Sequence, residues 1–321
     1  MRRRRLLRVV GAATAVWPAA ALAQPATKTH RVGVMARAFQ FEALREGLRE
    51  LGYSESGGLV FDHRPSTGSS ELLSSIAVDI VRQRADVIVV GGSESLQAAR
   101  QATSSVPIVM TLVADPVELG FVSSFARPGG DITGLSNMHT ELAGKWVELL
   151  READPRISRI GVLWNPFHPG HRNLIAGLDP LAAASRVQAL PLAVEGAEQI
   201  EAAIAAAARE RATGLIVLGS TLHIQNLRQI ADAALQAKVA ALAWTASFAE
   251  AGGLITYGAS ETAQFRRAAA YVDKILKGTS PADLPVEQPT RFEMAVNLRT
   301  ARSLGLVLPP AILARADQVI E

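Results

Sequence analysis

The side chains that most often carry chemistry are few and scattered in this 321-residue chain. It has six histidines and no cysteine, which excludes disulfides, thiolate zinc sites and cysteine nucleophiles. The histidines form no H-E-x-x-H zinc motif. The one close pair, His168 and His171, lies in a Pro- and Gly-rich stretch without an identifiable third ligand, which favours a surface loop over a metal site. We predict no metal site and no catalytic residue.

Motifs for binding phosphate or activating a serine are missing as well. The chain contains no G-x-x-x-x-G-K-[ST] loop, and no G-x-G-x-x-G fingerprint follows a strand. Residues 91–95, Gly-Gly-Ser-Glu-Ser, begin like a nucleophile elbow but end in serine where that motif needs glycine. We therefore expect a binding protein that uses no cofactor rather than an enzyme.

Polar and aromatic residues instead follow the apolar runs that predict strands. The carboxyl ends of parallel strands and the helix N-termini beyond them are where α/β sheets bind small molecules. Two of these residues have a structural alternative, since Ser93 suits a helix N-cap and Asp115 suits either an ammonium partner or a helix cap. The aromatic residues suit core packing or ligand contact. The predicted ligand-binding residues are Ser93, Glu94, Asp115, Asn165, Ser220, Thr221, Trp244, Phe248 and Tyr257.

The elements that must position these residues form an alternating pattern after Gln24. Short β-branched runs alternate with helical stretches, which is typical of parallel α/β units. Uniformly apolar runs of this kind suit a sheet covered by helices on both faces. The first part of the chain predicts strands at 31–35, 59–63, 86–90 and 107–112, with helices at 38–51, 71–83 and 93–102.

The pattern then restarts 128 residues later. Ile160–Leu163 repeats Val32–Met35 (160 − 32 = 128), and Leu215–Gly219 repeats Val87–Gly91 (215 − 87 = 128). Two matches in one register indicate two similar lobes rather than one long Rossmann-like sheet. The turn-rich stretch 277–285 is where the chain could cross back. We predict lobe 1 at 29–137 with a returning segment at about 282–298, lobe 2 at 138–281, and a C-terminal tail, 299–321, near the hinge.

The charge of the chain is concentrated at its start. The chain has 33 basic and 30 acidic residues, but five arginines fall in the first eight positions, and residues 1–23 contain no acid. Without that segment the balance is 28 − 30 = −2, which gives no support for a nucleic-acid partner. A basic start, an apolar core and Ala21-Leu22-Ala23 predict a signal peptide over 1–23, cleaved after export by the Sec or twin-arginine route. Since no cysteine follows, we expect an unlipidated protein in the periplasm.

Several longer segments resemble one known family, the extracytoplasmic substrate-binding proteins of ABC transporters related to the tryptophan/phenylalanine-binding group. The similarity runs over nearly the whole mature chain. One departure is the stretch 35–40, which is shorter than the small-residue loop of similar sequences, so no ligand contact is carried over to Phe39 or Gln40. The segments that carry the resemblance are 47–53, 85–90, 114–117, 126–134, 162–166, 250–258, 271–278, 283–293 and 314–320.

The resemblance implies a type I periplasmic-binding-protein fold: two Rossmann-like lobes with parallel sheets, three crossings and a cleft that closes about a hinge. It implies a substrate-binding component that captures a small polar ligand, such as an amino acid, and delivers it to an ABC permease in the inner membrane. We expect a monomer, which suits that docking. Two alternatives use the same scaffold: a periplasmic ligand sensor for a receptor, and an enzyme such as an isomerase or hydrolase.

Overall fold

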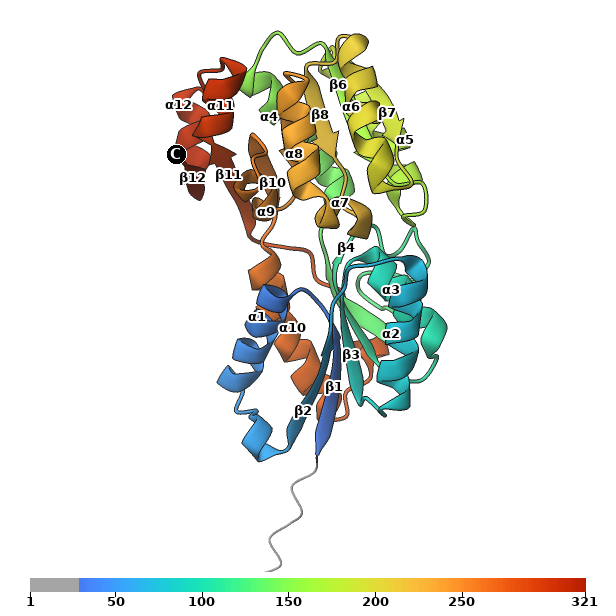
Figure 1. Ribbon diagram of the computed structural model, residues 1–321. Helices are drawn as coiled ribbons and strands as arrows, with labels where there is room; N and C mark the ends of the chain where they lie inside the picture. The colour runs from blue at the N-terminus through green and yellow to red at the C-terminus, as the bar shows by residue number, and fades with distance from the viewer. Residues whose placement is uncertain (1–28) are drawn as a thin grey trace, which may run out of the picture.

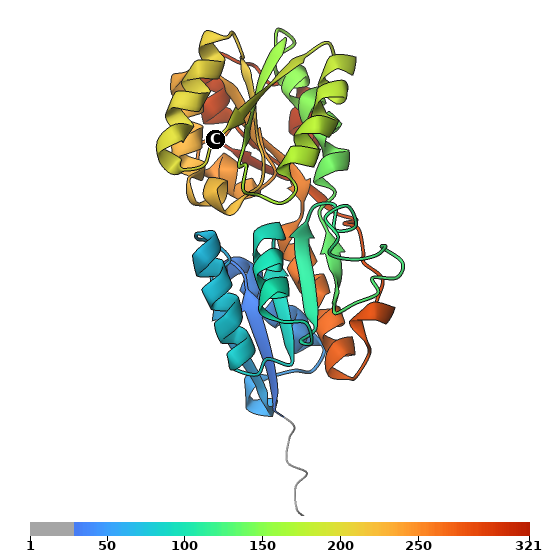
Figure 2. The ribbon, with the colours of Figure 1, turned by 90° about the vertical axis from the view of Figure 1, so that its right-hand side faces the viewer.

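The computed structural model describes residues 29–321, which form two α/β lobes joined at a narrow waist (Figures 1 and 2). The predicted signal peptide, residues 1–23, lies outside the described residues. Between residues 29 and 321, no helix has the length and apolar character needed to cross a membrane. Two helix-covered sheets, each made largely of parallel strands, confirm the predicted fold class.

Lobe 1 is a five-stranded parallel sheet in the order β2-β1-β3-β4-β5, with helices on both faces. The strands are β1 (His30–Met35), β2 (Leu59–Arg64), β3 (Val87–Gly91), β4 (Ile108–Val113) and β5 (Ile132–Ser136). The helices are α1 (Ala38–Glu50), α2 (Ser70–Arg82), α3 (Ser93–Ala102) and α10 (Glu261–Leu276), with short 3-10 turns η1 (Glu55–Gly57) and η3 (Pro281–Asp283).

The alternation of side chains along a strand explains why both faces of this sheet need cover. Val87 and Val89 of β3 pack in the cluster formed with α1 and α10, whereas Ile88 and Val90 pack in the cluster formed with α2 and α3. All four side chains are fully buried. An apolar run with no polar alternation is therefore the expected sequence for this strand.

Lobe 2 repeats this design and extends it. Its seven-stranded sheet has the order β12-β11-β10-β9-β8-β6-β7. The strands are β6 (Arg159–Trp164), β7 (Gln188–Ala193), β8 (Gly214–Val217), β9 (Ala240–Ala243), β10 (Ile255–Ala259), β11 (Phe292–Asn297) and β12 (Gln318–Ile320). The helical segments are α4 (His139–Ala153), α5 (His171–Ala184), η2 (Ala197–Gln199), α6 (Ile200–Arg209), α7 (Thr221–Gln225), α8 (Leu227–Gln236), α9 (Ala246–Glu250), α11 (Leu298–Leu304) and α12 (Pro310–Arg315).

The two sheets share one strand order over five strands. The order β7-β6-β8-β9-β10 in lobe 2 matches β2-β1-β3-β4-β5 in lobe 1. The strands related by the 128-residue offset, β1 with β6 and β3 with β8, occupy equivalent places in the two sheets. The lobes thus present corresponding strand ends, and these ends face the waist.

The first crossing between the lobes lies at the expected boundary, whereas the second and third differ from the expected ones. The first lies at Asn137 and Met138, the second at Ser260 and the third at residues 288–291. Residues 261–287, expected mostly in lobe 2, therefore belong to lobe 1, where α10 lies beside α1 (Figure 1). Conversely β11, expected to return to lobe 1, pairs antiparallel with β10 in lobe 2.

The packing of α10 explains this difference. Its apolar face, which includes Phe265, Ala268 and Val272, is fully buried in the core of lobe 1. A Cβ on Gly47 of α1 would lie 2.6 Å from the carbonyl oxygen of Arg266, so glycine is what allows the two helices to approach so closely. The turn after α10 stays on lobe 1, because the Tyr271 hydroxyl donates to the carbonyl of Pro285 (2.7 Å).

The C-terminal tail is an integral part of lobe 2. Strand β12 pairs parallel with β11 at the edge of the sheet. Leu308 and Ile312 are buried in the main core cluster of that lobe. The C-terminal tail therefore lies on the outer edge of lobe 2 and not near the hinge, where we had expected it (Figure 1).

Side-chain bonds to the backbone tie the crossings together. The Asn137 side chain donates to the carbonyl of Leu112 (2.9 Å) and accepts from the N–H of His139 (3.1 Å). Gln264, 3% exposed, accepts from the N–H of Leu112 and donates to the carbonyl of Ser136, both at 3.0 Å. The second and third crossings are also joined, by the backbone bond from Ser260 N–H to the Arg291 carbonyl (3.1 Å). Such bonds satisfy polar groups that a buried hinge would otherwise leave unpaired.

Candidate ligand-binding cleft

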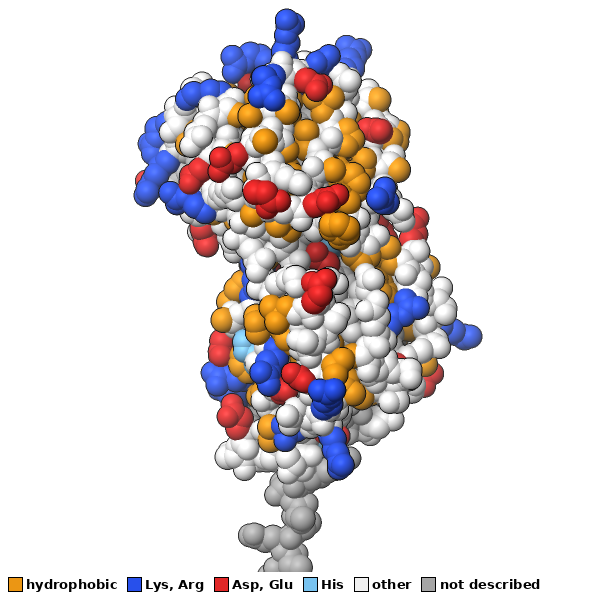
Figure 3. All heavy atoms as spheres, turned by 45° about the vertical axis from the view of Figure 1, so that its right-hand side comes forward, with side chains coloured by type: hydrophobic (Ala, Val, Ile, Leu, Met, Phe, Trp, Pro, Cys, Tyr) orange, Lys and Arg blue, Asp and Glu red, His pale blue; other side chains and the backbone are white. Residues whose placement is uncertain are grey.

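A cavity lies between the two lobes where their strand ends face each other. Its volume is about 680 Å³, counted together with its open mouth. The space-filling view in Figure 3 shows the molecule narrowing between the lobes, with acidic side chains above and below the narrowing. The polar lining consists of Arg37, Gln40, Ser66, Thr67, Ser93, Glu94, Asn137, His139, His168, His171, Ser220, Thr221 and Trp244.

The lobe 1 wall centres on the start of α3. Gly92, the N-cap residue, has φ +90°, a left-handed conformation that glycine adopts without strain. Ser93 is thus the first helical residue and lines the cavity at 2% exposure, so the N-cap alternative for Ser93 is wrong. Because a glycine N-cap has no side chain, it leaves the first N–H groups of this ten-residue helix without side-chain cover.

A charged network flanks this wall. The Arg37 guanidinium forms an ion pair with Glu261 at the start of α10, and Gln40 donates to the same carboxylate (2.5 Å). Gln40 also accepts from the backbone N–H of Arg37 (2.8 Å). Since Glu261 already neutralises Arg37, this corner of the cavity carries little net charge. Both Arg37 and Gln40 line the cavity, although the shortened loop had offered no basis for expecting a ligand contact there.

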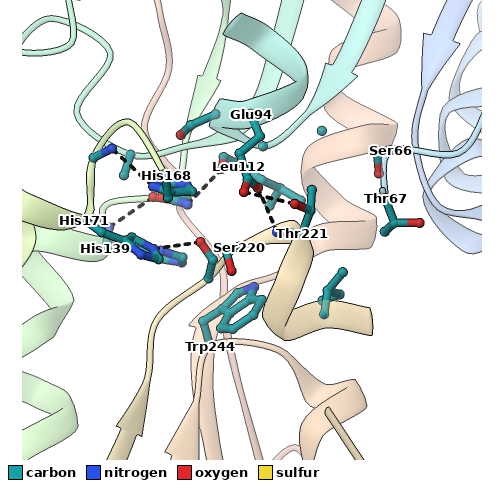
Figure 4. Close-up of a pocket in the computed structure, with 18 of the residues that line it drawn as sticks. Ser66, Thr67, Glu94, Leu112, His139, His168, His171, Ser220, Thr221 and Trp244 are labelled. Atoms are coloured by element: carbon teal, nitrogen blue, oxygen red, sulfur yellow. Dashed lines mark hydrogen bonds between the residues drawn. The ribbon is translucent and has the colours of Figure 1, made fainter. Parts of the chain in front are cut away.

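Three buried histidines, His139, His168 and His171, line the lobe 2 side of the cavity (Figure 4), and a fourth, His223, packs against His171. The rings of His168 and His171 stack with centroids 3.9 Å apart, and His171 stacks on His223 at 6.3 Å. His139 meets the edge of Trp146 at 5.4 Å. The predicted surface loop at His168 and His171 is therefore wrong, because these rings are 8% and 2% exposed.

Burial keeps these imidazoles neutral. It lowers the pKa of His139 and of His168 to about 3 and that of His223 to about 4. The pKa of His171 is also well below its usual range, because of burial first and the neighbouring His168 second. Within residues 29–321 no three His, Asp or Glu side chains are arranged to hold a metal ion.

Hydrogen bonds fix the tautomers of two of these rings. Nδ1 of His171 accepts from the N–H of Asn165 (3.0 Å), so its proton is on Nε2, which lies 3.0 Å from the carbonyl of Gly219. Nδ1 of His168 accepts from the N–H of Gly170 (3.1 Å). Its Nε2–H is thereby left as a donor on a side chain that lines the cavity.

One pair of side chains joins the lobes across the cavity. Glu94, in the first turn of α3, accepts from the backbone N–H of Thr221 (2.7 Å) and from its hydroxyl (3.0 Å) (Figure 4). Thr221 is the first residue of α7 in lobe 2. Burial raises the pKa of Glu94 to about 7, although both bonds from Thr221 act in the opposite direction. These direct contacts between lobes indicate a closed arrangement.

The structure brings five of the nine predicted ligand-binding residues to the cavity. Ser93 and Glu94 come from lobe 1, and Ser220, Thr221 and Trp244 come from lobe 2. In Figure 4 Trp244 lies below Ser220, at the end of β9.

The other four predicted residues lie elsewhere. Asp115 accepts a bond from the Thr140 hydroxyl beside the first crossing, and it is not among the residues that line the cavity. Asn165 accepts from the N–H of Phe167 (2.9 Å) and faces an outer hollow of the cleft. Phe248 is fully buried in the core of lobe 2, and Tyr257 stacks on Phe292 at 5.9 Å. For these two aromatic residues, core packing is the alternative that the structure supports.

Several lining residues had no sequence signal pointing to the site. Ser66 and Thr67 follow β2, an edge strand whose end had not been connected with the cleft. His139 follows the first crossing, at the predicted end of lobe 1, but that position had not been connected with the cleft. The pair His168 and His171 did carry a signal, since it follows a strand whose end faces the cleft. A position after such a strand indicates the binding site, whereas the Pro- and Gly-rich composition indicates a surface loop.

Comparison with known proteins gives consistent matches. A model of the family described as ABC transporter substrate binding protein matches residues 32–320. A tyrosine-binding protein of Clostridioides difficile is 25% identical over 261 residues, covering 81% of this chain and 75% of that protein. A solved structure of a conserved domain protein from Vibrio cholerae has a TM-score of 0.84 and 29% identity, covering 91% of this chain and 100% of that one.

A second solved structure extends the likeness in fold. An ABC domain from Streptococcus pneumoniae in complex with L-Trp has a TM-score of 0.84 and 21% identity, and it covers 91% of this chain and 100% of that one. The fold is therefore shared with structures whose sequences are only 29% and 21% identical to this chain.

Proposed function

Because this chain belongs to the family of ABC transporter substrate-binding proteins, we propose that its cleft captures a free amino acid for an ABC importer. The family is one of substrate-binding proteins, not of enzymes, and its members bind small ligands and work with ABC permeases. The observation that carries the amino-acid proposal is the cavity lining. One carboxylate and one uncapped helix start lie on the same wall, where they can meet the two charges of an amino acid.

The ligand carboxylate is assigned to the start of α3. The N–H groups of the first turn and the Ser93 hydroxyl are donors, and the helix dipole favours a negative charge at this end. The ligand ammonium is assigned to Glu94. Among the residues that line the cavity in the described part of the chain, Glu94 is the one carboxylate. Asp115, first considered for this role, lies outside the lining.

The ligand side chain is assigned to the lobe 2 wall. Trp244 and the neutral imidazoles of His139 and His168 offer flat aromatic surfaces, and Nε2–H of His168 offers a donor. An aromatic amino acid suits such a wall. The relatives support this assignment, since one is named for tyrosine and the other was solved with L-Trp.

Closure about the three crossings then completes the site. Ligand contacts from both lobes favour the closed form, and a permease can recognise that form. We also propose that the mature protein acts as a monomer in the periplasm after removal of residues 1–23. The basic, acid-free start of the chain supports export.

A charge placed in the cavity tests the position of the ligand carboxylate. Ser93→Asp puts a carboxylate at the start of α3, where the helix dipole favours it, so folding should be retained. Ser70→Asp is the matched control, because Ser70 is the exposed first residue of α2 and does not line the cavity. Calorimetry with L-tyrosine and L-tryptophan should show at least a 100-fold loss of affinity for Ser93→Asp and less than a twofold change for Ser70→Asp. Equal affinities in the two variants contradict the assignment.

A further inference from the structure

Two side chains separate the cavity from a second hollow on the outside of the cleft. This outer groove lies between α2 and α3 of lobe 1 and α7 of lobe 2, and it also contacts the loops around Phe167 and Glu195. Glu94 and Thr221 are the two residues that line both the cavity and the outer groove. Since they also bond to each other across the lobes at 2.7 and 3.0 Å, they form a gate between the two spaces.

The gate places a carboxylate where closure removes water from it. When the lobes separate, Thr221 leaves and Glu94 faces solvent at the start of α3. When they close, the partly buried carboxylate gains two bonds from Thr221 but loses hydration, and the net effect is to raise the pKa of Glu94 from 4.5 to about 7. The two bonds thus do not make up for the lost hydration, and a charged Glu94 opposes closure of the empty cleft.

We propose that the Glu94–Thr221 gate makes closure depend on a positive charge inside the cavity. The empty protein resists closing over the charged carboxylate, and a cationic group of the ligand beside Glu94 removes that resistance. The gate thereby selects ligands that carry a protonated nitrogen over neutral or purely anionic compounds of the same shape. This inference rests on the proposed function, because it concerns the same cleft, and it adds the reason why the cleft closes on its ligand.

The histidines around Glu94 do not change protonation in a way that imitates the gate. Inside the cavity, the pKa values of His139, His168 and His171 are lowered far enough to keep these rings neutral between pH 5 and 8, and Arg37 is paired with Glu261. His223, in α7 itself, also stays neutral, with a pKa of about 4. On the outer groove the facing carboxylates are Glu71 of α2, whose pKa is lowered by its bond with Ser69, and Glu195, which is exposed.

The direction of the pH effect follows from the two states of Glu94. The closed state binds a proton near pH 7, and the open state binds it near 4.5, so acid favours the closed state of the empty protein. Between pH 8 and pH 5 the ratio of closed to open protein should rise by about 70-fold.

The first experiment measures closure without any ligand. Because the chain has no cysteine, Gln83→Cys and Gln236→Cys, at the exposed ends of α2 and α8, give one dye site in each lobe for energy transfer. In ligand-stripped protein, lowering the pH from 8 to 5 should raise the closed fraction. The Glu94→Gln variant should have, at pH 8, the closed fraction that the protein with Glu94 intact has at pH 5. Its closed fraction should not change further as the pH is lowered. Glu195→Gln is the matched control and should keep the original pH profile.

Two results overturn the proposal. One is a closed fraction that does not change with pH in the protein with Glu94 intact. The other is a Glu94→Gln variant that keeps the original pH profile, which would assign the effect to another group.

The second experiment uses probes with and without an amine at pH 8. L-Tyrosine and L-tryptophan should close the labelled protein, whereas 3-(4-hydroxyphenyl)propanoate and indole-3-propanoate should not. Glu94→Gln should reduce this discrimination at least tenfold. Equal closure over both kinds of probe with Glu94 intact contradicts the requirement for a cation. If no amino acid closes the cleft while the ligand-free pH profile behaves as expected, the gate is supported and the proposed amino-acid ligand is wrong.

Discussion

Replacing His139 by phenylalanine should remove a measurable part of the acid sensitivity of lobe 2. His139 is 7% exposed, its ring lies against Trp146 and near Trp244, and burial lowers its pKa to about 3. Phenylalanine keeps an aromatic ring at this position but cannot take up a proton. The comparison concerns the change in stability with pH, so the two proteins need not be equally stable at neutral pH.

The magnitude follows from the difference in proton binding between the folded and unfolded chains. The unfolded histidine binds a proton near pH 6.5 and the folded one near 3, so its contribution to stability is complete above pH 6.5 and is lost as the pH falls toward 3. At pH 5 the unfolded state gains about 2 kcal/mol from this one residue. Between pH 7.5 and 5, the free energy of unfolding should therefore fall about 2 kcal/mol more with His139 than with phenylalanine.

Tryptophan fluorescence during urea denaturation measures the free energy of unfolding of lobe 2, where His139 lies. Once residues 1–23 are removed, the tryptophans are Trp146, Trp164 and Trp244, and all three are in lobe 2. Leu178→Ala is the control, because it weakens the same core without removing a titratable group and should keep the full drop with pH. If His139→Phe shows the same drop as the unaltered protein, the neutral, desolvated state of this ring is refuted.

Two further predictions concern α10, the helix that returns to lobe 1, and Asp115, the carboxylate that lies outside the cavity lining. Phe265→Ala should lower the free energy of unfolding of lobe 1 by about 3–5 kcal/mol, because this side chain of α10 is fully buried in the core of that lobe. Hydrogen exchange in β1 and β3 measures this effect, and unchanged protection there would show that α10 is not packed on that sheet. Asp115→Asn should change amino-acid affinity by less than twofold, since Asp115 bonds to Thr140 outside the cavity lining; a tenfold loss in calorimetry would place its side chain at the ligand.

The central strands of both lobes could be predicted from the sequence because their signal is local. A strand that is buried on both faces is apolar throughout, as Val87–Val90 shows, and the same signal recurs 128 residues later at Leu215. Ser93, Ser220 and Trp244 followed from those strands, because strand ends of parallel sheets face a common edge.

The second and third crossings and most of the cavity lining could not be predicted in this way. Whether α10 covers lobe 1 or lobe 2 depends on which core accepts Phe265. The amphipathic pattern of a helix shows which face is buried but not which sheet that face packs on. The turn-rich stretch after α10 resembled a linker, although Tyr271 holds it on lobe 1. The burial of His168 and His171 arises from long-range packing and from backbone bonds to Gly170 and Asn165, which spacing along the chain does not reveal.

The most direct test of amino-acid capture is equilibrium dialysis of the mature, ligand-stripped protein. The protein is dialysed against an equimolar mixture of the twenty amino acids and their deaminated counterparts, and mass spectrometry measures what is enriched on the protein side. The cavity predicts enrichment of at least one amino acid, at one molecule per chain, released chemically unchanged. Enrichment of no amino acid, or equal enrichment of a deaminated counterpart, would contradict the proposed function.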